Sequence, residues 1–194
     1  MKRLAHALLF TALLAASASG ISAQNVGGID FADEVPAARQ ALQLQGAGVR
    51  TRFGFRVYAM GLYLAQPQPE ADAIIAAAGE KRIRIVLLRD LEAKQFADAM
   101  VDGLRKNHDA ETLAALQPSI DRLLGALRAI GAAPKGTEIH LDQLADGGTR
   151  LSVNGSAHGD DIADSALYPA LLRIWLGQNP ADSGLKSAII GARS

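Results

Sequence analysis

The segment 82–89 (RIRIVLLR) constrains the fold more than any other part of the chain. Ile83 and Ile85 alternate with arginines at its start, while Val86 and Leu88 make both faces of its second half apolar. A strand with two apolar faces has to lie inside a sheet that is covered on both sides. We therefore expect this segment to be a central strand of a sheet.

A helical pattern follows this strand and supplies part of the cover. Residues 93–106 (AKQFADAMVDGLRK) have a period of 3.6 residues, with Phe96, Met100 and Leu104 in one line. On its own, such a line of apolar side chains is more typical of a core than of a pocket wall. Residues 70–78 predict another, shorter helix, which the glycine after them ends.

Helices also dominate the rest of the second half of the chain. Residues 109–130 carry a long apolar stripe with Asp109 as its N-cap, and Pro118 predicts a break or a restart inside it. Residues 165–176 (SALYPALLRIWL) predict an apolar helix, and a last short helix reaches Ile190.

The remaining strands are expected to pair antiparallel. Residues 29–31 form a short strand, and 46–64 are rich in aromatic and β-branched residues. Residues 136–144 and 149–154 flank a glycine turn, which is typical of a β-hairpin. Strands, helices, strands and helices in this order indicate an α+β fold with an antiparallel sheet covered by helices.

One strand face is chemically unusual. Alternation along residues 55–60 places Arg56, Tyr58 and Met60 together on one face of the strand. That face mixes a guanidinium, a phenol and a thioether, which does not suit a purely solvated surface. Arg50 lies just before this strand, and Arg52 and Arg56 are expected to be solvated.

Composition excludes several functions. The chain has 20 basic and 20 acidic residues, so it offers no excess positive charge for nucleic acid. It has no cysteine, which rules out thiol chemistry and thiolate metal sites. Its four histidines show no metal-binding spacing, so we expect no metal and no cofactor.

The N-terminus resembles a secretory signal. Residues 1–23 combine a basic start, an apolar stretch too short to span a bilayer and small residues that end at Ala23. We expect cleavage after Ala23, with 16–18 as a competing site, and an uncleaved anchor as the alternative. This predicts a periplasmic or secreted protein whose one domain is 24–194 and which keeps no stable membrane span after cleavage.

Three segments in order resemble the chalcone isomerase-like family, and its bacterial secreted branch most. They are GVRTRFGFRVYAMGLYL (48–64), RIVLLRDLEAKQFADAMVDGL (84–104) and ALYPALLRIWLGQNPADSGLKSAIIG (166–191). The resemblance covers nearly all of the chain after the signal. It implies an open-faced β-sandwich, in which a large antiparallel sheet is covered by a layer of helices with a ligand cleft between them.

The resemblance also bears on catalysis. The family contains enzymes that cyclise chalcones, and other members that bind fatty acids or have no assigned catalysis. The arginine of the enzymes corresponds to Arg50, but their threonine corresponds to Tyr58, their tyrosine to Phe96 and their asparagine to Gly103. Because most of this set is absent, the resemblance implies a protein that does not cyclise chalcones.

The hypothesis that follows is a binding protein for a small amphipathic carboxylic acid, such as a fatty acid. Arg50 would clamp the carboxylate with help from Tyr58, because a guanidinium suits a carboxylate bidentately. Met60, Phe96 and Met100 would line the apolar part of the cleft. In the simpler interpretation Arg50 pairs with an internal acid or caps a loop, and no ligand exists.

Two further functions remain open at this point. The chain could be an isomerase of the intramolecular lyase type on an unknown substrate, with Arg50 and Tyr58 as catalytic residues. It could also be an envelope interaction module without a small ligand, whose protein partner is unknown.

Overall fold

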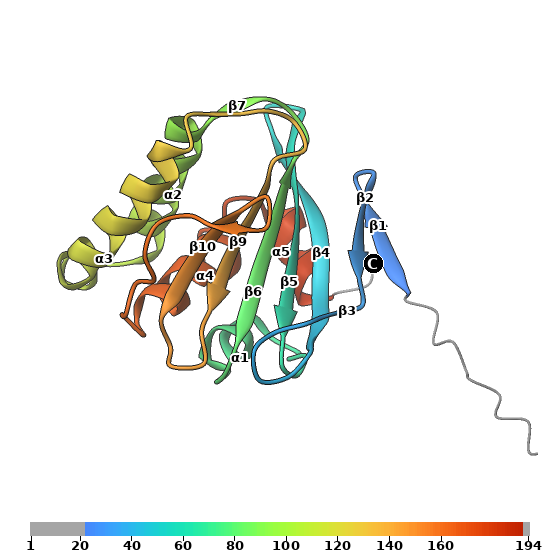
Figure 1. Ribbon diagram of the computed structural model, residues 1–194, viewed down its shortest axis with the longest axis horizontal. Helices are drawn as coiled ribbons and strands as arrows, with labels where there is room; N and C mark the ends of the chain where they lie inside the picture. The colour runs from blue at the N-terminus through green and yellow to red at the C-terminus, as the bar shows by residue number, and fades with distance from the viewer. Residues whose placement is uncertain (1–21, 192–194) are drawn as a thin grey trace, which may run out of the picture.

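A curled antiparallel sheet organises the computed structural model, which describes residues 22–191 (Figure 1). Its strands lie in the order β11-β10-β9-β6-β5-β4-β3. β6 (Lys81–Leu87) is the fourth of the seven, which confirms the predicted central strand. The other strands of the sheet are β3 (Glu34–Val35), β4 (Leu42–Arg52), β5 (Phe55–Leu64), β9 (Glu138–Gln143), β10 (Thr149–Val153) and β11 (Ser156–Ala157).

Helices cover one face of this sheet, and α4 and α5 lie behind it in Figure 1. They confirm the α+β fold with an antiparallel sheet covered by helices. Among the described residues, no helix is both long and apolar enough to cross a membrane. The helices are α1 (Ala71–Ala76), α2 (Ala93–Asn107), α3 (Ala110–Ala129), α4 (Leu167–Leu176) and α5 (Ser183–Ile190).

The main core lies between the sheet and these helices. α4 is buried almost all round, as its continuous apolar sequence predicts, and it carries Tyr168 and Trp175 into the core. α5 lies directly on β4 at Gly46. A Cβ atom at Gly46 would lie 2.4 Å from the carbonyl oxygens of Ala188 and Ile189, so no larger residue fits there.

Pro118 does not break the long helix, contrary to the expectation from its sequence. α3 runs without interruption from Ala110 to Ala129, and Asp109 caps it by accepting a hydrogen bond from the Thr112 amide at 2.8 Å. Proline removes one backbone hydrogen bond from a helix interior. Five side chains of α3 are buried against the core and hold the helix across this point: Leu116, Ile120, Leu123, Leu124 and Leu127.

A β-bulge changes which residues of β5 share a face. Arg50 of β4 pairs with Tyr58 and Thr51 pairs with Arg56, so Val57 is an extra residue. Arg56 therefore points to the outer face, where its guanidinium donates to the Gly27 carbonyl oxygen. Tyr58 points into the main core. The prediction that Arg56 and Tyr58 share a face was wrong, because simple alternation does not include the bulge.

The outer face of the sheet has a smaller cover. β1 (Ala23–Val26) and β2 (Ile29–Ala32) form a hairpin that lies at the side of the sheet in Figure 1. Phe31 of this hairpin packs with Tyr63 and the apolar residues around it in a second buried cluster. A separate pair of short strands, β7 (Leu91–Glu92) and β8 (Ala132–Ala133), joins the start of α2 to the end of α3.

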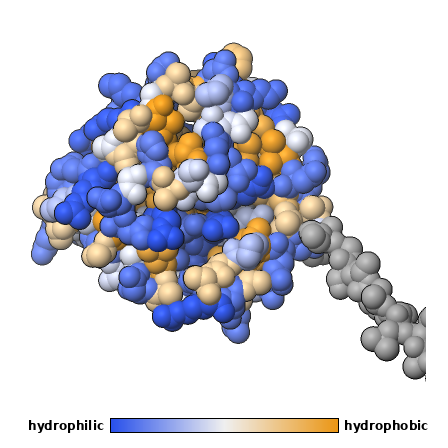
Figure 2. Space-filling model, viewed as in Figure 1, coloured by the Kyte–Doolittle hydropathy of each residue, from blue (hydrophilic) through white to orange (hydrophobic). Residues whose placement is uncertain are grey.

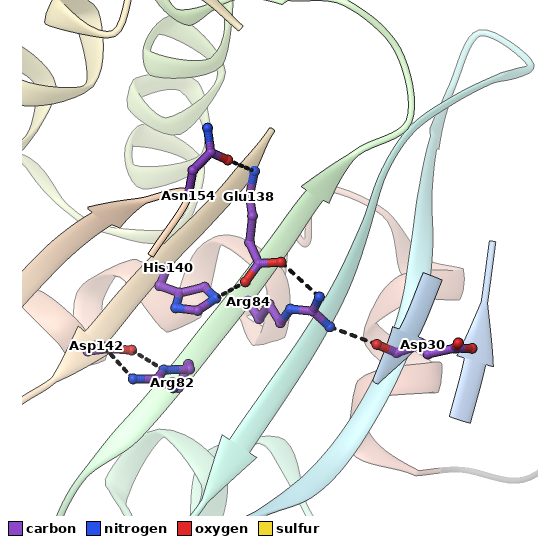
Figure 3. Close-up of polar contacts among 7 residues, drawn as sticks. All are labelled: Asp30, Arg82, Arg84, Glu138, His140, Asp142 and Asn154. Carbon is purple, nitrogen blue, oxygen red and sulfur yellow. Dashed lines mark hydrogen bonds and ion pairs between the residues drawn. The ribbon is translucent and has the colours of Figure 1, made fainter. Parts of the chain in front are cut away.

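A polar network holds this hairpin to the central strands (Figure 3). Arg84 donates to Glu138 Oε2 at 2.8 Å and to the Asp30 carbonyl oxygen at 2.8 Å, with its guanidinium 5.0 Å from the centroid of the Phe31 ring. His140 Nε2 donates to the other Glu138 oxygen at 2.6 Å. These contacts hold the pKa of Glu138 at about 2, with the His140 hydrogen bond as the largest cause.

Glu138 should therefore make the stability of the protein depend on acid pH. Its pKa in the fold lies below the ordinary value of 4.5, so its contribution is present above pH 4.5 and is lost as the pH falls towards 2. We expect Glu138→Gln to lower the free energy of unfolding by roughly 1–3 kcal/mol at pH 6, and by much less at pH 2.5. Denaturant titrations of both proteins at several pH values measure this difference.

The exposed Glu34 on β3 provides the matched control. Glu34→Gln removes the same charge away from the network and should leave the pH profile close to that of the wild type. An equal loss at pH 6 and pH 2.5 for Glu138→Gln would contradict the role of this carboxylate.

Candidate functional site

Arg50 lies where β4 meets a cleft at one end of the sheet, opposite Tyr58 on β5. Its guanidinium carbon lies 5.6 Å from the centroid of the Tyr58 ring, a cation–π distance. Arg50 Nε is buried and has no hydrogen-bond partner within residues 22–191. No carboxylate of that part of the chain lies within 4.0 Å of its guanidinium. The interpretation in which Arg50 pairs with an internal acid therefore finds no support among these residues.

Asp182 is an acid of this region, and other groups already use its carboxylate. Asp182 Oδ1 accepts from the Leu185 amide at 2.9 Å as the N-cap of α5. Its Oδ2 accepts from the Thr51 amide at 2.9 Å. Both oxygens are bound by backbone donors, so Asp182 fixes α5 against β4.

Tyr58 lies beneath Arg50 and is fully enclosed. Its hydroxyl accepts a hydrogen bond from Trp175 Nε1 at 2.7 Å, and its ring meets Phe96 edge to face with the centroids 6.1 Å apart. Burial raises the pKa of Tyr58, and the positive charge of Arg50 offsets part of that rise. The phenol is therefore neutral at physiological pH, and Tyr58 is 1% exposed.

The cleft itself has a volume of about 390 Å³. One wall is apolar and comes from β5, β7 and α2. The mouth is rich in arginine, and its acid, Asp90, accepts a hydrogen bond from the Lys135 amide at 2.7 Å. The lining residues are Arg50, Arg52, Phe53, Phe55, Val57, Arg89, Asp90, Leu91, Gln95, Phe96 and Ala99.

Other hollows of similar or larger volume exist, but their chemistry differs. One lies between α2 and α3, and another beside the outer part of β4. Among the described residues, three buried side-chain polar atoms lack a partner, on Arg50, Tyr63 and Thr149. Of these three residues, Arg50 is the one that lines a hollow described above.

The residues predicted from the sequence separate into two groups. Arg50 and Phe96 line the cleft, and Tyr58 touches both of them from the core side. Met60 and Met100 are 0% and 2% exposed and belong to the main core, and they are not among the described residues on the cleft wall. The cleft also contains residues that were not predicted from the sequence: Phe53, Phe55, Val57, Arg89 and Leu91. In the sequence, Gly54 between two phenylalanines could have indicated a turn with exposed aromatic side chains.

The positions that carry the catalytic set in the enzymes of the resembled family do not form a catalytic array here. Phe96 presents a ring without a hydroxyl to the cleft. Gly103 lies where α2 packs on α4, and a Cβ atom there would lie 2.7 Å from Ile174 Cγ2. An asparagine at this position would therefore displace α4. Two of the expected polar groups are absent, and the third position, Tyr58, is bonded to Trp175.

The hydrogen bond from Trp175 predicts a specific effect on stability. Tyr58→Phe should lower the free energy of unfolding by about 1–3 kcal/mol, because it leaves a buried indole N–H without an acceptor. Trp175 is the single tryptophan of the chain, so its fluorescence reports both the unfolding transition and the change in its surroundings.

Tyr63 gives the matched control for this measurement. Its hydroxyl is buried without a partner among the described residues, so Tyr63→Phe strands no other group and should be neutral or slightly stabilising. Equal losses of unfolding free energy in Tyr58→Phe and Tyr63→Phe would show that the hydrogen bond from Trp175 does not stabilise the protein.

Comparison with known proteins agrees with the fold. The family model described as chalcone isomerase-like matches residues 23–191. A fatty-acid binding protein of Arabidopsis thaliana has the same fold, with a TM-score of 0.65 and 15% identity over 85% of this chain and 93% of that chain. No curated protein sequence matches the chain significantly. Since the family model spans most of the chain, as the three segments predict, the protein belongs to the chalcone isomerase-like family.

Proposed function

We propose that this protein binds a small amphipathic carboxylic acid of the fatty-acid type, without catalysis, and that Arg50 clamps the carboxylate. The observation that carries the proposal is Arg50, which lines a cleft with one apolar wall and whose buried Nε has no acceptor within residues 22–191. A buried donor without a partner is costly. Arg50 as a whole is half-buried, and its guanidinium forms no ion pair with a carboxylate of the described residues. A ligand carboxylate would supply both the acceptor and the counter-charge.

The cleft suits the rest of such a ligand. Its volume of about 390 Å³ lies within the range of small-molecule sites, roughly 300–1,000 Å³. A hydrocarbon tail that extends from the carboxylate would contact Val57, Leu91, Phe96 and Ala99. Tyr58 would assist from below, because its ring holds the guanidinium in place at a cation–π distance.

The comparisons support this direction. The Arabidopsis thaliana protein that shares the fold is a fatty-acid binding protein. At 15% identity this likeness shows the fold alone. Arg50 and its cleft are the features of this chain that favour an acid.

The arrangement of side chains around Arg50 does not favour the alternative function as an isomerase. Cyclisation of a chalcone needs donors aimed at a developing oxyanion and a phenolate held near the enone. Tyr58 is enclosed beneath Arg50, and its hydroxyl already accepts from Trp175. Phe96 and Gly103 offer no side-chain donor, so Arg50 stands without the groups that the reaction would need.

We also propose that the protein acts in the periplasm or outside the cell. This rests on the signal-like sequence of residues 1–23, which lies outside the described residues except for Ser22 and Ala23. The intact mass of the exported protein should correspond to a chain that begins at Gln24. A mass that retains residues 1–23 would show that no cleavage after Ala23 takes place.

Arg50→Ala should weaken the binding of a saturated long-chain carboxylic acid by about 10- to 150-fold. This range follows from the roughly 1.5–3 kcal/mol of a hydrogen bond to a charged group. Isothermal titration calorimetry of the delipidated protein measures the affinity. Arg50→Lys should restore part of it, because an ammonium keeps the charge but lacks the planar fork of the guanidinium.

Two controls separate the clamp from a general effect of charge. Arg122→Ala removes the same charge from an exposed position on α3 and should leave acid binding unchanged. The methyl ester of the same acid should bind wild type and Arg50→Ala with similar, weak affinity. Wild-type affinity of Arg50→Ala for the acid would refute the clamp.

A further inference from the structure

Two large apolar side chains stand in solvent at the mouth of the cleft. Phe53 is 86% exposed and Phe55 is 63% exposed, and they are the exposed large hydrophobic residues of the described part of the chain. Both belong to the tip of the β4–β5 hairpin, at the same end of the molecule as β7 (Figure 1). Most of the face in Figure 2 is hydrophilic, with hydrophobic residues in small separate groups.

The backbone conformation at this tip does not suit the residue that adopts it. Arg52 pairs with Phe55, so Phe53 and Gly54 form a two-residue turn with φ angles of +50° and +78°. Asparagine and glycine fit such a turn, whereas a bulky residue in the left-handed region is strained. Because Phe53 is almost fully exposed, no buried contact offsets this strain. Folding alone therefore does not explain a phenylalanine at this position.

The charges around the tip are positive. The guanidinium of Arg52 lies 5.2 Å from the centroid of the Phe53 ring, and that of Arg89 lies 5.4 Å from the Phe55 centroid. Arg52 and Arg89 are both exposed, and neither forms an ion pair with another described residue. Asp90 is the acid of this mouth, and its carboxylate binds the Lys135 amide.

We propose that the hairpin tip docks on an anionic lipid bilayer, with Phe53 and Phe55 in the headgroup region and Arg52 and Arg89 on lipid phosphates. Aromatic rings settle at the membrane–water interface, and each arginine near an anionic surface adds attraction. A convex turn with two rings fits this role better than a protein interface, since stable interfaces bury about 1,200–2,000 Å². The tip borders the cleft, so docking would place the cleft mouth at the lipid surface.

The residues of the tip also line the cleft, so docking is tested on protein free of acid. Purified protein is co-sedimented with vesicles of phosphatidylglycerol and phosphatidylcholine, and with vesicles of phosphatidylcholine alone. We expect binding to the anionic vesicles and much weaker binding to the neutral ones. Binding should fall when the ionic strength rises from about 0.01 M to about 0.15 M, which shortens the Debye length from about 30 Å to about 8 Å.

Substitutions at the hairpin tip test whether it docks on the bilayer. The double variant Phe53→Asn, Phe55→Ser should lower the partition onto anionic vesicles by at least about tenfold, since burying even one phenylalanine is worth roughly that factor. Phe53→Asn alone should also weaken binding while keeping or raising the unfolding midpoint, because asparagine suits a positive φ. Any effect of the N-terminus is the same in all proteins and cancels in the comparison.

Further variants keep docking and acid binding apart. Arg52→Gln with Arg89→Gln should remove most of the salt dependence, whereas Arg50→Ala should lose the acid and still bind vesicles. Equal partition of wild type and the double variant would overturn the proposal, as would equal binding to neutral and anionic vesicles. If wild type ignores vesicles but self-associates through the tip, the surface is a protein interface and the proposal also fails.

Discussion

The contact between Trp175, Tyr58 and Arg50 is the interaction on which the site depends. Trp175 comes from the most buried helix, and its indole N–H is satisfied by Tyr58 on the sheet. Tyr58 in turn lies under the Arg50 guanidinium. Core packing therefore determines where this cation lies. Arg50 lines the cleft, and its buried Nε has no acceptor within residues 22–191.

Much of the fold could be predicted from local patterns. The two apolar faces of 82–89 indicated the central strand, and the glycine turn between 144 and 149 indicated the hairpin of β9 and β10. Pro118 was misjudged because the buried stripe of α3 outweighs one lost hydrogen bond, and that balance depends on tertiary packing. The bulge at Val57 was missed because an extra residue in one strand is visible only against its partner strand.

The site could be predicted in part from the sequence. Arg50 was identified because it corresponds to the arginine of the enzymes in the resembled family. Met60 and Met100 lie in the core, since periodicity shows which side chains face inward but not whether a cleft reaches them. Phe53 and Phe55 look like ordinary strand residues in the sequence. Their exposure and the left-handed φ of Phe53 become visible once the hairpin is built.

A crystal structure of the protein with a saturated long-chain carboxylic acid would show whether Arg50 holds the carboxylate. We expect carboxylate density within hydrogen-bond distance of the Arg50 guanidinium and a hydrocarbon tail along Val57 and Phe96. A ligand bound elsewhere, or an acid-soaked crystal with ordered water alone at Arg50, would contradict it.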